Sequence, residues 1–318
     1  MRAIWLREFG GPEVLVLGAA PDPTPGPGQV LIDVAHANIT FVETQLRSGR
    51  PGPFRVTPPL ILGNGVGGVI TAVGPDVDPA LIGQRVVSAT GGSGGYAERA
   101  AVDASVPIVV PAGLALDEAV ALLADGRTAT MLIEAVGVRA GDRVLVEAAA
   151  GGVGSLLVQL AARAGARVIG AAGGPRKVEL LPGLGAALAV DYLRPEWADR
   201  VRAAVGGVDV VLDGVGGSMA LAAFELLAPG GRMVSFGLAS GDWSPVSAET
   251  AAARGVTLVR PDVPPARLRA YTEQALADAA AGRLRPLIGQ RFPLERAADA
   301  HAAIEARATV GKTLLDVA

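Results

Sequence analysis

Hydrophobic and polar positions alternate through the first part of the chain. Residues 30–39, VLIDVAHANI, follow the two-residue period of a strand with one buried face. Residues 2–10 and 13–21 are predicted to form short strands on either side of a Gly-Pro turn. Closely spaced glycines in residues 61–74, ILGNGVGGVITAVG, are typical of tight bends in a curved sheet. This pattern predicts a compact, mainly antiparallel β domain.

The pattern changes near Leu116, where residues 116–138 take up a helical period. Asp117 is a candidate cap for this helix, and Gly126 is expected to interrupt it. Nearly continuous apolar strands then alternate with helices. The predicted strands are residues 142–148, 166–172, 187–192, 208–214, 232–237 and 255–260. The predicted helices between them are residues 152–165, 175–185, 195–206 and 218–231.

Such alternation predicts an α/β fold in which helices cover both faces of a doubly wound parallel sheet. The last part of the chain, with helices over 265–281 and 294–307 and a strand over 311–317, does not extend the alternation. We expect it to return to the first domain. Two domains follow, with these boundaries: residues 1–118 together with 261–318, and residues 119–260.

Composition and charge exclude several classes of partner and location. The 318 residues, half of them hydrophobic, suffice for two domain cores. The net charge of −3 comes from interspersed signs, so no basic field is present for nucleic acid or an anionic membrane. Charges at Arg2, Arg7 and Glu8 argue against a signal peptide, and Glu147 and Gln159 interrupt the longest apolar run. We expect a soluble, cytoplasmic protein with no membrane span.

The chain contains no cysteine and only two histidines, His36 and His301. Disulfides, thiolate zinc sites, iron–sulfur clusters and cysteine nucleophiles are thereby excluded. A catalytic zinc would need an unusual set of nitrogen and oxygen ligands, so we expect no metal site. Both histidines are expected to be structural.

Residues 144–165, VLVEAAAGGVGSLLVQLAARAG, combine a strand, a glycine-rich turn and a helix. Ala149 stands where the Gly-x-Gly-x-x-Gly pattern has its first glycine, and Gly151, Gly152 and Gly154 follow. A pyrophosphate at the N-terminus of such a helix faces free backbone N–H groups and the positive end of the helix dipole. This placement predicts a dinucleotide site. The alternative is a glycine turn that serves only close packing.

The end of the next strand distinguishes the two nicotinamide dinucleotides. NAD sites place an Asp or Glu there to bind the ribose 2′-hydroxyl. This chain has GGPRK, residues 173–177, with no acid and with Arg176 and Lys177 at a helix start, where phosphate is favoured. We therefore predict NADPH as the cofactor. The alternative is that both basic residues only decorate a surface helix.

Several motifs, in their order and spacing, point to one known family. They are MRAIWLREFGGPEVL at residues 1–15, GGYAERAAVD at 94–103, AAAGGVG at 148–154, VLDGVGG at 211–217 and AHAAIEARATVGKTLL at 300–315. Together they resemble the medium-chain dehydrogenase/reductase superfamily, and within it the zinc-free quinone oxidoreductase, or zeta-crystallin-like, branch. The resemblance covers nearly the whole chain.

The resemblance implies a Rossmann NADPH-binding domain inserted in a GroES-like catalytic domain, and a homodimer. The expected cofactor-binding residues combine those that the resemblance implies with the glycines and basic residues named above. They are Thr128, Gly151, Gly152, Val153, Gly154, Gly173, Arg176, Lys177, Tyr192, Phe236 and Gly237. Lys177 and Tyr192 would hold the 2′-phosphate. Gly174 replaces a hydroxyl residue that relatives usually carry beside that phosphate.

The expected reaction pocket departs from the family. Zinc-dependent relatives have Cys, a His–Glu pair and another Cys at about the places of Thr40, Asn64 and Asp125 in this chain. The candidate catalytic residues are Asn38, Thr40, Asn64, Asp125 and Arg127. Alternatives stay open: Asp125 and Arg127 could form a surface pair, Asp125 could cap a helix, and Asn64 could serve a left-handed backbone.

Other polar residues have simpler interpretations. Glu43 and Arg47, four residues apart on a helical turn, are expected to form an ion pair. Tyr96 is expected to pack inside the β domain rather than to donate a proton. Lys312 begins the last strand and could face either the cofactor or solvent.

Alcohol oxidation in this superfamily needs a metal to stabilise an alkoxide. Hydride addition to a conjugated acceptor is easier, because charge delocalises onto a distant carbonyl oxygen, and it needs orientation and enolate donors. The expected function is NADPH-dependent, zinc-independent reduction of a small-molecule quinone or α,β-unsaturated carbonyl. Two alternatives remain: a dedicated enoyl or enone tailoring reductase of a biosynthetic pathway, and a non-catalytic, crystallin-like NADPH-binding protein.

Overall fold

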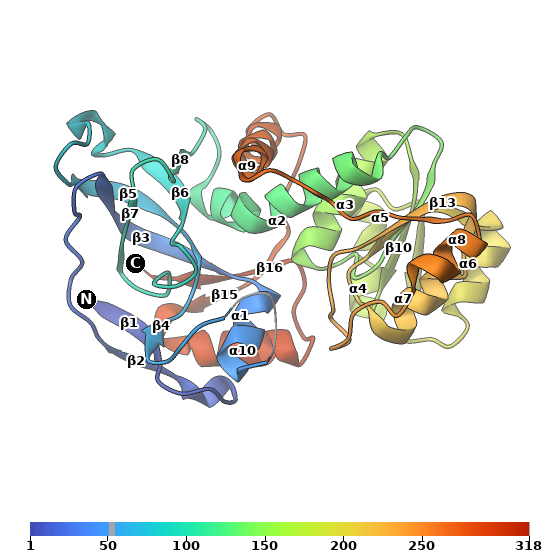
Figure 1. Cartoon of the computed structure of the whole chain (residues 1–318), viewed down its shortest axis with the longest axis horizontal. Coiled ribbons are helices and arrows are strands. Elements are labelled where there is room, and N and C mark those ends of the chain that lie inside the picture. Colours follow the sequence, from blue (N-terminus) through green and yellow to red (C-terminus); the bar gives the residue numbers. More distant parts are fainter. Residues whose placement is uncertain (51–54, 318) are drawn as a thin grey trace. The chain divides into compact units, whose positions relative to one another are not determined.

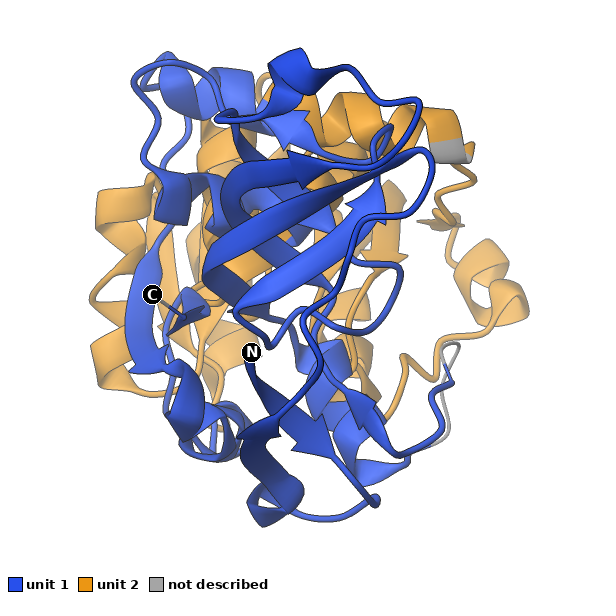
Figure 2. Cartoon of the chain, turned by 90° about the vertical axis from the view of Figure 1, so that its left-hand side faces the viewer, with its two compact units in different colours: residues 1–124, 275–318 blue, residues 125–274 orange. Residues whose placement is uncertain are grey.

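The computed structural model describes residues 1–50 and 55–317, and the chain forms two compact units (Figure 2). Unit 1 comprises Met1–Ala124 and Ala275–Ala318, and unit 2 comprises Asp125–Gln274. The boundaries fall inside two helices, α2 (Leu116–Val136) and α9 (Pro265–Ala280). Each unit has its own sheet and its own hydrophobic core.

Unit 1 is built mainly from strands. In the described part of the chain they are β1 (Arg2–Leu6), β2 (Leu15–Ala19), β3 (Gln29–Ile39), β4 (Leu60–Ile61), β5 (Gly65–Val73), β6 (Arg85–Ala89), β7 (Arg99–Asp103), β8 (Ile108–Val109), β15 (Ile288–Pro293) and β16 (Lys312–Asp316). Its helical elements are α1 (Phe41–Ser48), α10 (Ala297–Glu305), η1 (Pro12–Val14), η2 (Pro79–Leu81) and η3 (Leu294–Arg296). Helices α1 and α10 lie next to each other (Figure 1).

Strand β3 is the centre of the larger sheet of unit 1. The strand order is β15-β16-β3-β5-β6-β8, and β7 also pairs with β3. Strands β16, β5 and β7 all run antiparallel to β3. Apolar and polar residues alternate along β3 in step with buried and exposed positions. Val30, Ile32 and Val34 belong to the core, whereas Asp33 is exposed. A second, smaller sheet has the order β2-β1-β4.

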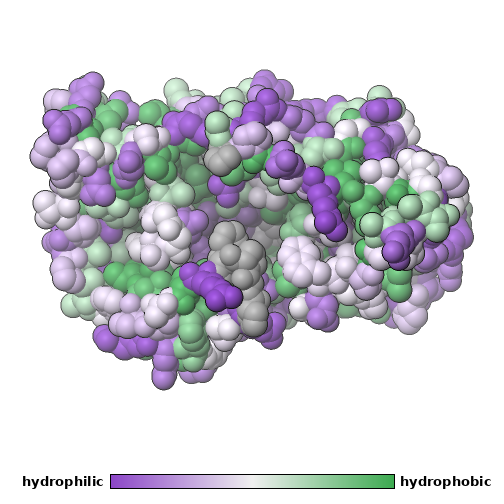
Figure 3. Space-filling view, in the orientation of Figure 1, coloured by the Kyte–Doolittle hydropathy of each residue, from purple (hydrophilic) through white to green (hydrophobic). Residues whose placement is uncertain are grey.

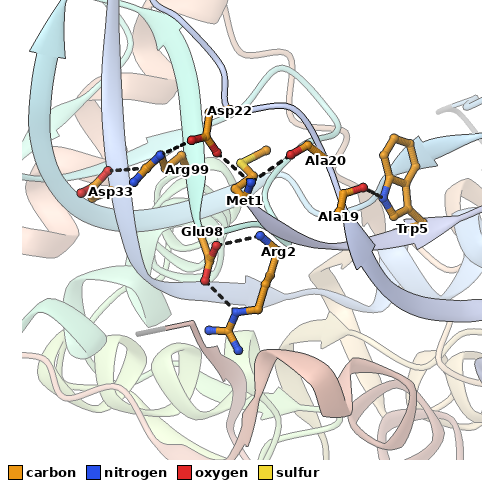
Figure 4. A network of polar contacts seen from close by, with 9 residues as sticks. All are labelled: Met1, Arg2, Trp5, Ala19, Ala20, Asp22, Asp33, Glu98 and Arg99. Atoms are coloured by element: carbon orange, nitrogen blue, oxygen red, sulfur yellow. Dashed lines mark hydrogen bonds and ion pairs between the residues drawn. The ribbon is translucent and has the colours of Figure 1, made fainter.

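A polar network lies around β1 at the N-terminal end of the chain (Figure 4). The Met1 ammonium group lies 2.7 Å from Asp22, and Arg99 lies 2.6 Å from the same carboxylate. Arg2 Nε lies 2.7 Å from Glu98. Because solvent reaches at least one partner of each pair, these pairs contribute little to stability. The strand is therefore positioned mainly by its backbone pairing with β2 and β4 and by its buried side chains.

Unit 2 is a parallel sheet with helices between its strands. The strands are β9 (Arg143–Val146), β10 (Arg167–Ala172), β11 (Leu188–Asp191), β12 (Val208–Asp213), β13 (Leu227–Ser235) and β14 (Thr257–Leu258). The helices, besides parts of α2 and α9, are α3 (Gly152–Arg163), α4 (Pro175–Val178), α5 (Leu181–Leu184), α6 (Trp197–Val205), α7 (Gly217–Phe224) and α8 (Ala248–Ala253).

The strand order of unit 2 is β11-β10-β9-β12-β13-β14, and all neighbours are parallel. The order reverses between β9 and β12. In open sheets of this kind, ligands bind beyond the carboxyl ends of the strands at such a reversal. The strands read as continuous apolar runs because both faces are covered: Leu145, Ile169 and Val211 are fully buried.

The predicted fold class is confirmed, with a doubly wound parallel sheet in unit 2 and a mainly antiparallel sheet in unit 1. Several details differ. The helix predicted over 218–231 ends at Phe224 as α7, and strand β13 already begins at Leu227, because Pro229, Gly230 and Gly231 disfavour a helix. Helix α2 runs through Gly126 without interruption, because a buried glycine costs a helix only about 1 kcal/mol. The helix predicted over 175–185 is divided into α4 and α5, with Pro182 in the first turn of α5. Strand β15 was not predicted.

The surface mixes polar and apolar side chains. On the face drawn in Figure 3, hydrophilic and hydrophobic residues are interspersed. The exposed large hydrophobic side chains come from separate elements, such as Val16 of β2, Val109 of β8 and Leu221 of α7. None of the helices in the described ranges combines the length and the apolar character required to cross a bilayer.

Candidate active site

The glycine-rich turn joins β9 to α3 at the carboxyl end of the sheet in unit 2. Gly151 is the N-cap of α3 and supplies no side-chain hydrogen bond to the first turn of the helix. Gly151, Gly152 and Val153 are partly exposed there. The Gly151 N–H donates to the Ala148 carbonyl at 2.8 Å, whereas the N–H groups of Gly152 and Val153 lie at the positive end of a helix of 12 residues, which favours an anion.

The backbone of this turn is crowded from within. A Cβ on Gly154 would lie 2.2 Å from the carbonyl oxygen of Ala148, and one on Gly151 would lie 3.2 Å from the same atom. Ala148 itself has φ +48°, a left-handed conformation that costs an L residue roughly 1 kcal/mol. Ala149 is buried and donates its N–H to the Ala171 carbonyl at 3.0 Å. The turn has the small residues and accessible helix start that the pyrophosphate of a dinucleotide needs.

Lys177 and Tyr192 lie on the segments that follow β10 and β11, two strands paired in parallel. Both residues are partly buried, whereas Arg176 is exposed on α4. The Tyr192 ring packs against Gly173, where a Cβ would lie 3.0 Å from Tyr192 Cε2. Gly174 has φ +89°, which favours glycine over the hydroxyl residues of relatives.

An acid lies beside this turn, contributed by the neighbouring strand. Asp191 ends β11, and its Oδ1 accepts hydrogen bonds from the backbone N–H groups of Gly174 at 2.9 Å and Leu193 at 3.0 Å. The sequence interpretation considered only the end of β10 and missed this residue. Because its Oδ1 binds the backbone N–H groups of Gly174 and Leu193, Asp191 shapes the turn that carries Lys177.

Gly214, Phe236 and Gly237 pack together where β12 and β13 end. A Cβ on Gly214 would lie 2.9 Å from Phe236 Cζ, and one on Gly237 would lie 2.5 Å from the Gly214 carbonyl oxygen. The Phe236 N–H donates to the Asp213 carbonyl at 2.9 Å. The two predicted cofactor residues of this segment are thus held against the loop after β12.

The predicted cofactor residues of unit 2, apart from Thr128, follow the carboxyl ends of neighbouring parallel strands. Strand β9 leads to the glycine-rich turn, β10 to Gly173, β11 to Tyr192 and β13 to Phe236. This is the edge at which doubly wound sheets bind dinucleotides. The structure therefore brings this part of the set to one edge of one sheet.

Asp125, Arg127 and Thr128 lie on α2. Asp125 is 8% exposed and stands in the middle of the helix, so it is neither a surface residue nor a helix cap. Arg127 and Thr128 are partly buried. Burial lowers the pKa of Arg127, and the negative charge of Asp125 opposes that shift.

Sequence reasoning also missed two acids in unit 2. Glu147 directly follows β9 and Asp213 ends β12, and both are fully buried. Asp213 Oδ1 accepts hydrogen bonds from the N–H groups of Val215 at 2.9 Å and Gly216 at 2.7 Å. The signal was present in the sequence, because each acid comes directly after an apolar strand and before a glycine-rich loop.

Glu43 organises a polar cluster in unit 1. Its Oε2 accepts hydrogen bonds from both the backbone N–H and the hydroxyl group of Thr40, each at 2.5 Å. Its Oε1 accepts the backbone N–H of Asn64 at 3.1 Å. Thr40 and Glu43 form the capping box at the start of α1. Two of the candidate catalytic residues, Thr40 and Asn64, are thereby joined through one buried carboxyl group.

Burial raises the pKa of Glu43. The hydrogen bonds from Thr40 and Asn64 and the positive charge of Lys312 oppose this shift but do not cancel it. Lys312, at the start of β16, is itself buried. A carboxyl group with a raised pKa keeps its proton to higher pH than a free one does, and this one touches the Thr40 hydroxyl group.

The predicted ion pair between Glu43 and Arg47 is wrong. Arg47 is buried, pairs with Glu305 of α10 and donates Nη1 to the Gly10 carbonyl at 2.8 Å. Helical spacing identifies neighbours on one helix only. It could not show that α10 supplies a different acid for Arg47.

Asn64 is exposed, with its side-chain oxygen fixed. Oδ1 accepts the N–H groups of Gly92 at 2.6 Å and Thr90 at 3.3 Å. The left-handed backbone in this segment belongs to Gly63, at φ +94°, and not to Asn64. The left-handed interpretation of Asn64 is therefore wrong, and the NH2 group of its amide is a donor at the protein surface.

Asn38 is 2% exposed and serves packing. A Cβ on Gly65 would lie 2.6 Å from the Asn38 amide. Asn38 Nδ2 lies 3.5 Å from the Val120 carbonyl oxygen, at the limit of a hydrogen bond. This burial makes Asn38 a weaker candidate for substrate contact than Thr40 or Asn64.

Candidate catalytic residues occur in both units: Asn38, Thr40 and Asn64 in unit 1, Asp125 and Arg127 in unit 2. Across residues 1–50 and 55–317, no three His, Asp or Glu side chains gather where one metal ion could bind.

Two protein-family models match the chain. The alcohol dehydrogenase GroES-like domain matches residues 26–112, and the zinc-binding dehydrogenase family matches residues 184–315. The first match confirms the GroES-like assignment of the antiparallel sheet.

Several characterised proteins are similar over the full length. The quinone oxidoreductase of Pseudomonas aeruginosa is 33% identical over 99% of this chain and 99% of its own length. The 2-haloacrylate reductase of a Burkholderia species is 33% identical over 98% of this chain and 97% of its own. The crystal structure of Escherichia coli quinone oxidoreductase complexed with NADPH matches with a TM-score of 0.91 and 28% identity, covering 100% of both chains.

Proposed function

This chain belongs to the medium-chain dehydrogenase/reductase superfamily, in its zinc-free quinone oxidoreductase branch, and we propose that it is an NADPH-dependent reductase of conjugated carbonyl compounds. The substrate class comprises quinones and α,β-unsaturated carbonyls. The observation that carries this proposal is the contact between the Thr40 hydroxyl group and buried Glu43, because reduction of such a compound requires a proton and this pair can supply one.

Bound NADPH supplies the hydride. In unit 2, the glycine-rich turn suits the pyrophosphate through the N–H groups at the start of α3. Lys177, supported by Tyr192, is proposed to select the 2′-phosphate. Phe236 and Gly237, packed against Gly214, are proposed to line the nicotinamide end of the site.

Hydride addition to the β-carbon of an enone leaves an enolate, which then takes up one proton. We assign the donation of that proton to the Thr40 hydroxyl group, which recovers it from Glu43. The Asn64 amide NH2 is the candidate donor for the enolate oxygen, because its carbonyl oxygen is already bound to the backbone. Asp125 and Arg127 remain candidates for orienting the acceptor.

The test is a steady-state screen of NADPH oxidation by the full chain. The acceptors are naphthoquinone, phenanthrenequinone, a short enone, a 2-haloacrylate and an enoyl thioester, with the saturated analogue of each as a control. We expect turnover with conjugated acceptors and none with the saturated analogues. Tight NADPH binding without any turnover would contradict reduction and favour the crystallin-like alternative. Turnover confined to the enoyl thioester would identify the tailoring reductase.

A further inference from the structure

Glu147 and Asp213 form a buried carboxyl pair that the proposed reaction does not use. Both side chains are 0% exposed. Strands β9 and β12 pair in parallel, with Leu212 opposite Val146, so the next residues, Asp213 and Glu147, stand opposite each other. The Glu147 N–H extends this pairing by donating to the Leu212 carbonyl at 3.0 Å. Opposed residues on adjacent strands point to the same face of the sheet, so the two carboxyl groups are neighbours.

The donors around this pair are too few for two carboxylates. Asp213 Oδ1 accepts the N–H groups of Val215 and Gly216. Asp213 Oδ2 and both Glu147 oxygens are buried and have no hydrogen-bond partner of normal geometry in the described chain, although the Val215 N–H is close enough to act on Glu147. Two ionised groups would leave three unpaired acceptors and two like charges in the interior. A single proton on Glu147 removes one charge and supplies Asp213 Oδ2 with a donor.

The pKa shift of Glu147 also favours a proton on this residue. Burial raises the pKa of Glu147 well above its usual range, and the hydrogen bond with Asp213 and its negative charge raise it further. The backbone N–H of Val215 opposes the shift only in part. Within the described residues, Asp213 is the one titratable side chain that acts on this shift.

The pair lies at the carboxyl ends of β9 and β12, where each acid directly precedes a loop of the expected cofactor site. Glu147 precedes Ala148, the strained first residue of the glycine-rich turn. Asp213 precedes Gly214, against which Phe236 packs. Strands β9 and β12 also flank the point where the strand order reverses. A bond between the two carboxyl groups therefore ties the pyrophosphate turn to the segment expected to line the nicotinamide.

We propose that Glu147 and Asp213 hold one proton between them and act as positioning residues, whose hydrogen bond keeps the two loops in the arrangement that binds the dinucleotide. This inference rests on the proposed NADPH-dependent function. When the shared proton is lost at alkaline pH, two negative charges lie below the cofactor phosphates and the bond between the loops is gone. Dinucleotide affinity then falls.

The shared proton is tested first, by infrared spectroscopy of the full chain without cofactor at neutral pH. We expect the carbonyl stretch of a protonated carboxylic acid in the wild-type protein and its loss in Glu147→Gln. In Asp213→Asn burial, the largest cause of the raised pKa, remains, so Glu147 should stay protonated while its carbonyl band shifts in frequency with the new partner. A wild-type acid band that survives in Glu147→Gln, or that does not shift in Asp213→Asn, would overturn the shared proton.

The positioning role is tested by NADPH fluorescence titration from about pH 6 to about pH 10. We expect the wild-type Kd to rise on the order of tenfold towards alkaline pH, whereas Glu147→Gln, whose amide donates to Asp213 at every pH, stays nearly flat. Glu147→Ala should bind weakly throughout, because Asp213 loses its partner. Identical pH profiles for the wild type and Glu147→Gln would overturn the positioning role.

Failure of the proposed function has a different signature. A wild-type protein that binds no NADPH at any pH would refute the cofactor assignment and the positioning role together, while the infrared band would still decide the shared proton. A purely structural pair would lower the unfolding temperature in the variants and leave the pH profile of Kd unchanged, which also counts against positioning.

Discussion

The Tyr96 hydroxyl group lies 3.1 Å from Nε2 of His301, and both side chains are buried in unit 1. The two rings meet edge to face, at an interplanar angle of 84°. Burial lowers the pKa of His301 from 6.5 to about 3, and the positive charge of Arg47 contributes to this shift. His301 is therefore held neutral inside the core.

Because His301 is neutral in the folded chain, the stability of unit 1 depends on pH in the acid range. The unfolded chain protonates His301 near pH 6.5, whereas the folded chain does so only near pH 3. The stabilisation is present above pH 6.5 and is lost as pH falls, by up to about 1.4 kcal/mol for each pH unit in that window. His301→Gln should flatten this part of the dependence of unfolding free energy on pH, measured by urea titration.

Tyr96→Phe is the matched control for that measurement. It removes the hydrogen bond but keeps the imidazole buried. We expect a loss of about 1 kcal/mol at every pH and an unchanged slope in acid. A wild-type protein with the same acid slope as His301→Gln would contradict the assignment.

Lys177 should decide between the two nicotinamide dinucleotides. We expect NADPH to bind at least about tenfold more tightly than NADH, equivalent to about 1.4 kcal/mol. Lys177→Ala should remove most of this difference, because it takes away a charge at the predicted 2′-phosphate position. Arg200→Ala, at an exposed position of α6, is the control and should leave the ratio of the two Kd values as it was. Equal wild-type affinities would contradict the phosphate site.

Gly154 should tolerate no side chain. The Cβ of Gly154→Ala would lie 2.2 Å from the Ala148 carbonyl oxygen, so the turn must move. We expect a loss of about 1–3 kcal/mol in the free energy of unfolding and weaker NADPH binding. Gly183→Ala adds the same methyl group in α5, where no atom beyond its own helical turn lies within 4 Å, so it should leave NADPH binding unchanged and should not lower the free energy of unfolding, which alanine can raise by up to about 1 kcal/mol. Both are measured by thermal unfolding and fluorescence titration.

Thr40 should be needed for turnover but not for cofactor binding. Thr40→Val removes the hydroxyl group that contacts Glu43, and we expect kcat to fall about a hundredfold with an unchanged Kd for NADPH. Thr40→Ser keeps the hydroxyl group and should restore most of the rate. In the wild type, kcat should decline as pH rises through the raised pKa of Glu43, because the donor is the protonated acid.

The control for Thr40→Val addresses the helix cap. Loss of the cap alone costs α1 about 1 kcal/mol, so unfolding is measured beside kcat. An unchanged kcat in Thr40→Val, with the expected loss of stability, would show that Thr40 only caps the helix. In that case the proton comes from another group.

The parallel sheet was predictable because continuous apolar strands and glycine-rich turns leave strong local patterns. Strand β15 was not predictable, because its residues alternate between partly buried and exposed positions with none fully buried, and because its pairing with β16 is set by tertiary structure. Residues 288–293 contain Gly, Gln, Arg and a final Pro, none of which favours a strand. Its existence depends on the edge that β16 offers.

The polar cluster around Glu43 could not be predicted from the sequence, for a related reason. The capping box of Thr40 and Glu43 is local and could have been recognised from the spacing. The third partner, Asn64, and the buried cation Lys312 come from distant segments that meet only in the folded unit. The pair of Glu147 and Asp213 likewise needed the strand order, which places β9 beside β12.

The place of β16 has a consequence for synthesis on the ribosome. In the sheet of unit 1, β16 lies between β3 and β15, yet it is translated after the whole of unit 2. Unit 2 is one continuous segment, Asp125–Gln274, and can complete its sheet before β16 is available to pair with β3. Until β16 is translated, one edge of β3 carries unpaired N–H and C=O groups, so during that interval the nascent chain is exposed to wrong strand pairing.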